Sequence, residues 1–126
     1  MTNASTIATN YLQAVEKGDF DAARKLLDDE LSFKGPLETL HSPEPFIESL
    51  KKLHPIVQRI DIKKIFTDGN DVCVLCDLVT NSPAGTVFVV EWYQIKNAKI
   101  ADIRVVFDPR PFAAMFHAGA SAQKGS

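Results

Sequence analysis

The sequence predicts an α+β fold in which N-terminal helices precede a curled antiparallel sheet. Two observations support it. Apolar residues recur at helical spacing up to residue 55, and from residue 58 they follow the alternation of strands separated by short turns. A length of 126 residues is typical of one domain, so we expect a single domain over residues 1–126.

The first half of the chain contains three predicted helices. A first helix is expected over residues 5–18, where a serine can cap the start and a glycine can end it. Asp19 can cap a second helix, which we expect to continue to the acidic residues 28–30, although acids at a helix C-terminus are electrostatically unfavourable. A third helix is expected from residues 42–43 to Pro55, because proline suits the first helical turn and disfavours helix in the residue before it.

The second half of the chain contains four predicted strands. Apolar runs alternate there with clusters of Asp, Asn, Gly, Ser and Pro, which are typical of turns. Because the links are short, consecutive strands should pair as an antiparallel meander. The strands are expected over residues 58–66, 72–80, 86–95 and 99–107. A short helical turn is expected over residues 112–117 and a disordered tail over 119–126.

Composition excludes several classes of function. The 14 basic and 16 acidic residues give a net charge of −2, and without a block of lysine or arginine we expect no nucleic-acid binding. No apolar run approaches the roughly 18 residues of a membrane span, and the N-terminal region shows no signal-peptide pattern. We therefore expect no membrane association and a cytoplasmic location. No set of His, Cys, Asp and Glu has the spacing of a metal site, so we predict no metal and no other cofactor.

Cys73 and Cys76 have the CxxC spacing of redox and zinc sites. Their context is a predicted strand, in which these two side chains point to opposite faces and lie about 10 Å apart along the chain. A disulfide needs Cα atoms within about 7 Å of each other. We therefore predict two free thiols that act as small buried hydrophobic groups.

The central predicted strands are apolar on both faces. On the third of them one face carries Phe88, Val90 and Trp92, and the other carries Val87, Val89, Glu91 and Tyr93. The helices can cover only one face of the sheet, and an uncovered face would be polar. For a chain this short, the simplest cover for the second face is another copy of itself. We therefore predict a homodimer with Phe88, Val90 and Trp92 in the interface.

Glu91 is the one charged residue on its otherwise apolar strand face. Flanking by Val89 and Tyr93 removes water from the carboxyl, which raises its pKa unless another group compensates. Carboxyls of this kind are enriched at functional sites. The alternative is that Glu91 lies at the rim of the sheet or pairs with a lysine.

Several segments together resemble the nuclear transport factor 2-like superfamily: residues 11–19, 28–29, 40–42, 99–107 and the Asp-Pro pair at 108–109. This superfamily includes ketosteroid isomerase, limonene epoxide hydrolase, scytalone dehydratase and SnoaL-type polyketide cyclases. The resemblance covers residues 4–112 and implies a cone-shaped, cystatin-like α+β roll. In such a roll three N-terminal helices pack on a strongly curved antiparallel sheet and enclose an apolar pocket, and dimers form through the convex face.

Ketosteroid isomerase gives the most specific comparison. The resemblance implies that Tyr11 and Glu91 lie at the positions of its catalytic tyrosine and of its protonated aspartate, the known case of a neutral carboxylic acid at an active site. Phe107 lies at the position of a pocket tryptophan. The general base of that enzyme falls on Gly35, which cannot accept a proton, so steroid-type isomerisation is not expected.

Other acids of the later strands are further candidates, because such groups act in SnoaL-type cyclases and epoxide hydrolases. Strand alternation places Asp77 and Asp102 outside the pocket, with Asp102 paired to Arg104. Asp108 is expected at the pocket rim and His41 near the mouth of the cone. The predicted pocket is lined by Val74, Cys76, Val89, Tyr93, Phe107, His41 and Asp108.

Two functions follow from these expectations. In the first, the pocket binds a small apolar ligand, and Tyr11 and Glu91 polarise a carbonyl or hydroxyl group in cofactor-independent isomerase, dehydratase or cyclase chemistry. In the second, the chain is a non-catalytic dimeric module that binds a ligand or a protein, which the glycine at position 35 favours. The fold alone does not choose between them, because one scaffold hosts many functions.

Overall fold

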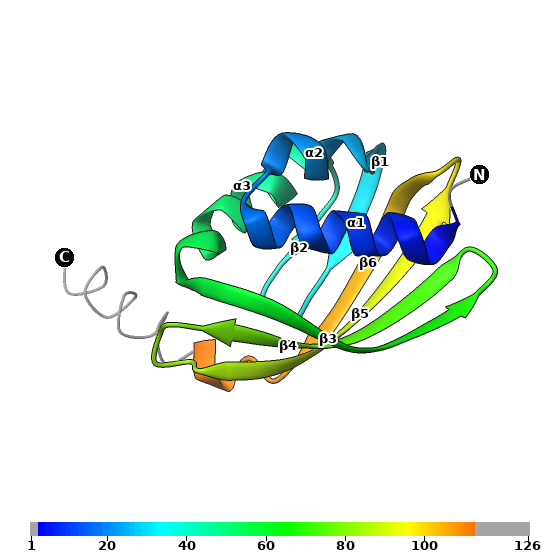
Figure 1. Ribbon diagram of the computed structural model, residues 1–126. Helices are drawn as coiled ribbons and strands as arrows, with labels where there is room; N and C mark the ends of the chain where they lie inside the picture. The colour runs from blue at the N-terminus through cyan, green and yellow to red at the C-terminus, as the bar shows by residue number, and fades with distance from the viewer. Residues whose placement is uncertain (1–2, 113–126) are drawn as a thin grey trace.

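The computed structural model describes residues 3–112, in which helices lie on one side of a curved sheet (Figure 1). The helices are α1 (Ala4–Lys17), α2 (Phe20–Lys25), α3 (Pro43–Leu53) and the 3₁₀ turn η1 (His54–Ile56). The strands are β1 (Leu27–Lys34), β2 (Thr39–Leu40), β3 (Val57–Asp68), β4 (Asp71–Thr80), β5 (Thr86–Lys96) and β6 (Lys99–Phe107). The α+β class predicted from the sequence is confirmed.

The six strands form one sheet in the order β2-β1-β6-β5-β4-β3. The four strands β3 to β6 pair as the predicted antiparallel meander. β1 departs from that prediction, because it pairs parallel to β6 and makes the sheet mixed. The parallel pairing is possible because β1 comes from the helical half of the chain, and a long connection through α3 and four strands separates it from β6.

The predicted second helix is too long. α2 ends at Lys25, and residues 27–30, which we expected to continue it, open β1 instead. Leu27 and Leu31 lie four residues apart, so a strand also places them on one face, and both are fully buried there. The acids between them then avoid the negative end of a helix dipole. The same unfavourable acids were visible in the sequence and were the signal against the longer helix.

The first and third helices begin and end close to the predicted residues. Asn3, rather than Ser5, caps α1: its side chain accepts a hydrogen bond from the Thr6 backbone N–H at 2.8 Å. Gly18 ends α1 with φ of 76°, and a Cβ there would lie 2.7 Å from the His54 ring, so both the backbone angle and the space require glycine. α3 begins at Pro43 and gives way to the 3₁₀ turn at His54.

The core lies between the helices and the concave face of the sheet (Figure 1). Phe112, the last described residue, is buried there and makes an edge contact with Phe107 at 5.5 Å between ring centroids. Most of the helical turn predicted over residues 112–117, and all of the tail predicted over 119–126, lie outside the described residues. Among the helices of residues 3–112, none is long and apolar enough to cross a membrane.

Candidate functional site: a buried carboxyl on the concave face of the sheet

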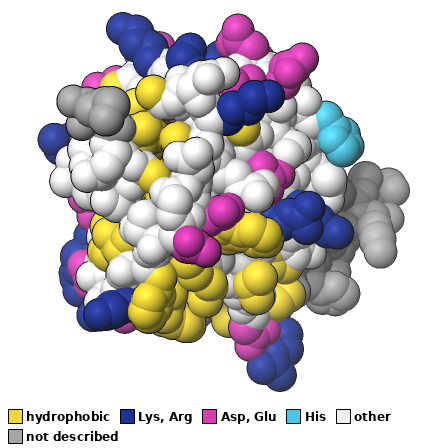
Figure 2. Space-filling view, turned by 90° about the vertical axis from the view of Figure 1, so that its right-hand side faces the viewer, with side chains coloured by type: hydrophobic (Ala, Val, Ile, Leu, Met, Phe, Trp, Pro, Cys, Tyr) yellow, Lys and Arg dark blue, Asp and Glu magenta, His cyan; other side chains and the backbone are white. Residues whose placement is uncertain are grey.

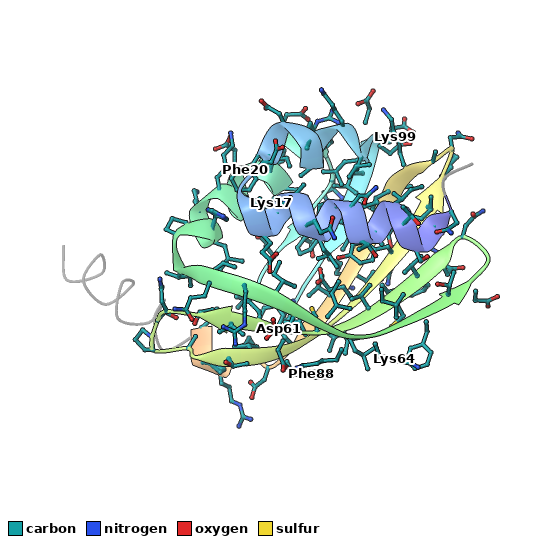
Figure 3. The ribbon with its side chains drawn as sticks, viewed as in Figure 1. Lys17, Phe20, Asp61, Lys64, Phe88 and Lys99 are labelled. Carbon is teal, nitrogen blue, oxygen red and sulfur yellow. The ribbon has the colours of Figure 1, made fainter. Side chains whose placement is uncertain are left out.

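The two faces of β5 are those that the sequence predicts. Val87, Val89 and Tyr93 are buried against the helices, whereas Phe88 is 52% exposed and Trp92 is 41% exposed on the opposite, convex face. In Figure 3 the Phe88 side chain lies on the side of the sheet away from the helices. Glu91 therefore shares the inner face with Val89 and Tyr93, between Val74 of β4 and Val105 of β6.

Both oxygens of the Glu91 carboxylate accept a hydrogen bond. The Tyr93 hydroxyl donates to Oε1 at 2.8 Å, and the Cys76 thiol donates to Oε2 at 3.5 Å. Tyr93 is two residues along the same strand, and Cys76 comes from the neighbouring strand β4. Glu91 is half-buried as a residue, and its carboxyl group is removed from water.

Burial sets the proton affinity of this cluster. Loss of water raises the pKa of Glu91, and the hydrogen bonds from Tyr93 and Cys76 lower it by a smaller amount. Burial and the nearby Glu91 charge raise the pKa values of Tyr11 and Tyr93, so both phenols stay protonated at neutral pH. The same two causes raise the pKa of the Cys76 thiol. The site thus combines protonated donors with one carboxyl whose proton affinity is increased.

Tyr11 reaches this region from α1 but has a different neighbourhood from Tyr93. Its ring stacks on Phe46 at 6.4 Å between centroids and makes an edge contact with Tyr93 at 5.7 Å. Phe46 also packs on Phe33 at 4.7 Å. Within the described residues, the hydrogen bonds to Glu91 come from Tyr93 and Cys76 and not from Tyr11. Tyr11 and Glu91 are thus close enough for the Glu91 charge to raise the pKa of Tyr11, although no direct hydrogen bond joins the two side chains.

The residues predicted to line the pocket do not all lie together. Val74, Cys76, Val89 and Tyr93 are buried on the concave face, and Phe107 is half-buried near Phe112. His41 and Asp108 are exposed. Two hollows on the described part of the chain lie elsewhere: one of about 170 Å³ between α2 and α3, and one of about 30 Å³ between α1 and β3.

The other candidate acids lie away from the concave face, and each is paired with a basic side chain. Asp77 forms an ion pair with Lys63 at 3.6 Å, and Asp102 lies 3.5 Å from Arg104, the partner that the sequence suggested. The hydroxyl of Ser32 also donates to Asp102. The Arg110 guanidinium, 2.7 Å from the exposed Asp108 carboxylate, lowers the pKa of that acid to about 2. Of the four acids considered, Glu91 is the one that faces the interior.

The partners of Glu91 are what sequence reasoning missed. Tyr93 and Cys76 were predicted only as parts of the pocket wall. The two-residue spacing of Glu91 and Tyr93 on a strand was a usable signal, because it places both side chains on one face. Cys76 could not be assigned in this way, since its contact depends on the register of β4 against β5.

Among residues 3–112, no three His, Cys, Asp or Glu side chains gather as they would around a metal ion.

The convex face is the second conspicuous surface. Large hydrophobic side chains stay exposed on it, and Figure 2 shows hydrophobic groups gathered at the lower side of the molecule, bordered by acidic and basic ones. The Trp92 indole N–H donates to Asp71 at 3.0 Å, and Arg104 lies over the Trp92 ring at 6.0 Å. The exposed large hydrophobic residues of this face are Phe66, Phe88, Trp92 and Val106.

Comparison with solved structures supports the fold. A nuclear transport factor 2-like protein of unknown function from Cytophaga hutchinsonii is 26% identical, with a TM-score of 0.79 over 89% of this chain and 96% of that one. A protein from Kribbella flavida is 21% identical, with a TM-score of 0.86 over 96% and 99%. An epoxide hydrolase of M. tuberculosis, described as LEH-like, is 19% identical, with a TM-score of 0.73 over 98% and 96%.

The family assignment rests on the sequence itself. Comparison with curated proteins gives no match. The SnoaL-like domain family, however, matches residues 8–103, a range that runs from α1 into β6 and includes Tyr11, Cys76, Glu91 and Tyr93. The chain therefore belongs to the SnoaL-like domain family, within the nuclear transport factor 2-like superfamily that its sequence resembles.

Proposed function

We propose that the chain binds a small, largely apolar ligand at the concave face of the sheet and that Glu91 exchanges a proton with it. The observation that carries this proposal is a buried carboxyl on an apolar face, whose oxygens accept hydrogen bonds from Tyr93 and Cys76 and whose pKa burial raises. A raised pKa brings a carboxyl closer to neutral pH, where one group can both accept and return a proton.

The chemistry that fits is a cofactor-independent isomerase, dehydratase or cyclase reaction. Glu91 would take a proton from a carbon or hydroxyl of the ligand, and the Tyr11 hydroxyl would donate a hydrogen bond to the oxygen on which negative charge develops. Tyr11 suits this role because it stays protonated and makes none of the recorded hydrogen bonds to Glu91. The glycine at position 35 leaves Glu91 as the base in this scheme.

A set of small cyclic ketones provides the test. Each ketone is titrated into ¹⁵N-labelled protein, and its deuterium uptake from D₂O is followed by proton NMR. We expect shifts to concentrate on β4 and β5 residues that face the interior, and deuterium uptake that Glu91→Gln abolishes. Shifts confined to Phe88, Val90 and Trp92, or no shifts and no exchange with any ketone, would contradict the proposal.

The second candidate function is a non-catalytic dimeric module, in which the concave face holds a ligand or protein without chemistry. The convex face favours the dimer, because exposed Phe66, Phe88, Trp92 and Val106 form an apolar surface of the kind that protein partners cover. The occupant we propose is a second copy of the chain, packed over Phe88, Val90 and Trp92. Sedimentation velocity tests it: a dimer at micromolar concentration is expected, and a monomer there would rule it out.

The free thiols Cys73 and Cys76 are consistent with a reducing compartment such as the cytoplasm.

A further inference from the structure

We propose that Tyr93 is a positioning residue, whose hydroxyl group stabilises the ionised form of the Glu91 carboxyl and fixes its orientation. This inference rests on the proposed role of Glu91 and deepens it. It also changes the role that sequence reasoning gave to Glu91, from a neutral hydrogen-bond donor to a carboxylate that accepts hydrogen bonds.

The geometry assigns one donor to each oxygen of Glu91. Tyr93 Oη lies 2.8 Å from Oε1, and Cys76 Sγ lies 3.5 Å from Oε2. The Tyr93 side chain is fully buried, and the edge contact with Tyr11 restrains its ring. Because the Tyr93 side chain is already held in place, its hydroxyl loses little conformational entropy when it binds the carboxylate. Because each carboxylate oxygen has two lone pairs, each keeps one free for a ligand.

Hydrogen bonds take the place of a salt bridge at this site. The ionisable groups that face Glu91 within the described residues are Tyr11 from α1, Cys76 from β4 and Tyr93 from β5, and none of them is a cation. Val105 of β6 lies opposite Glu91 and is apolar. An unpaired carboxylate in such surroundings is stabilised by the donors that reach it, and the shorter, oxygen-based contact is the stronger of the two.

The test is the pKa of Glu91 in Tyr93→Phe, a change that keeps the buried ring and removes the donor. Carboxyl-carbon NMR of ¹³C-labelled protein follows the titration, and circular dichroism checks the fold. We expect the pKa of Glu91 to rise by about one to two units above that of the unmodified protein, as for the loss of a hydrogen bond to a charged group. Tyr11→Phe is the matched control, because it removes a buried hydroxyl that does not bond to Glu91, and its shift should be clearly smaller.

A measurement on the unmodified protein covers the case in which Tyr93→Phe fails to fold. The Cζ resonance of Tyr93 should move at the same pH midpoint as the Glu91 carboxyl, and a Cζ that does not respond would overturn the inference. An unchanged Glu91 pKa in folded Tyr93→Phe would also overturn it and would leave the proposed function standing. An ordinary Glu91 pKa in the unmodified protein would instead remove the proposed function itself.

Discussion

Neighbouring residues of β5 have opposite surroundings. Tyr93 is fully buried on the concave face and hydrogen-bonded to Glu91, whereas Trp92 is substantially exposed on the convex face and bonded to Asp71 at the surface. Both faces are largely apolar, and the concave one contains the Glu91 carboxyl, which burial removes from water. An apolar strand face can therefore contribute to the core or stay exposed at the surface, and on β5 the face that contributes to the core also carries Glu91.

The largest expected effect is a difference in unfolding free energy between alanine variants of these two residues. Tyr93→Ala should lower the free energy of unfolding by about 3–5 kcal/mol, because it leaves a cavity in the core. Trp92→Ala should cost about 1 kcal/mol or less where the chain is monomeric, since much of the indole is already in water. Urea denaturation at low protein concentration measures both, and equal losses would show that the two faces are not different in the monomer.

The second prediction concerns association through the convex face. Phe88→Asp should weaken the proposed dimer by about 30-fold or more, as expected when a charge replaces an aromatic residue in an interface centre. Leu37→Asp is the control, because Leu37 is a similarly exposed apolar residue between β1 and β2. Sedimentation over a concentration series should detect the change for Phe88 only. An equal response of the two variants would place the interface elsewhere.

The third prediction uses pH to probe the concave face. Burial raises the pKa of Glu91 in the folded state, so its contribution to stability is fully present below the unfolded value of about 4.3 and is lost as pH rises through the folded pKa. The variant Glu91→Gln has no ionisable carboxyl at this position, so it does not lose this stability as pH rises. The variant should gain stability relative to the unmodified protein as pH rises through that window, by about 1.4 kcal/mol for each unit by which the pKa is raised. Urea unfolding at a series of pH values measures the difference, and parallel curves would contradict it.

The smallest perturbation is chemical labelling of the two thiols. Cys73 is partly exposed beside Trp92 on the convex face, whereas Cys76 is buried and its pKa is raised. A disulfide reagent needs the thiolate, so Cys73 should react quickly in the folded monomer and Cys76 only after unfolding. Dimer formation should slow the reaction of Cys73. Equal rates for the two thiols would contradict the assignment of the faces.

The fold was predictable where one local rule decided the structure. Strand alternation placed Phe88 and Trp92 opposite Tyr93, and the residue ranges of β4 to β6 follow from their turns. The second helix was predicted too long, because Leu27 and Leu31 fit one face of a helix or of a strand, and their burial against β6 decided between the two. The parallel pairing of β1 with β6 depends on contacts about 70 residues apart, which no local pattern contains.

The candidate site was predictable in part for a similar reason. Glu91 stood out as a single charge on an apolar face, and its position there follows from alternation. Its hydrogen bond to Cys76 depends on the register between two strands, and the outward positions of His41 and Asp108 depend on loops that follow no repeat. Periodicity therefore identified the acid, and three-dimensional packing was needed to identify what holds it.

The most direct test of the account is the pH titration of the Glu91 carboxyl carbon in the unmodified protein. Asp108 provides an internal reference in the same spectra, because Arg110 lowers its pKa to about 2. We expect Glu91 to titrate above the ordinary value of about 4.3 for a glutamate, in the direction opposite to Asp108. A Glu91 midpoint at or below that ordinary value would contradict the claim that the concave face holds a desolvated, proton-exchanging carboxyl.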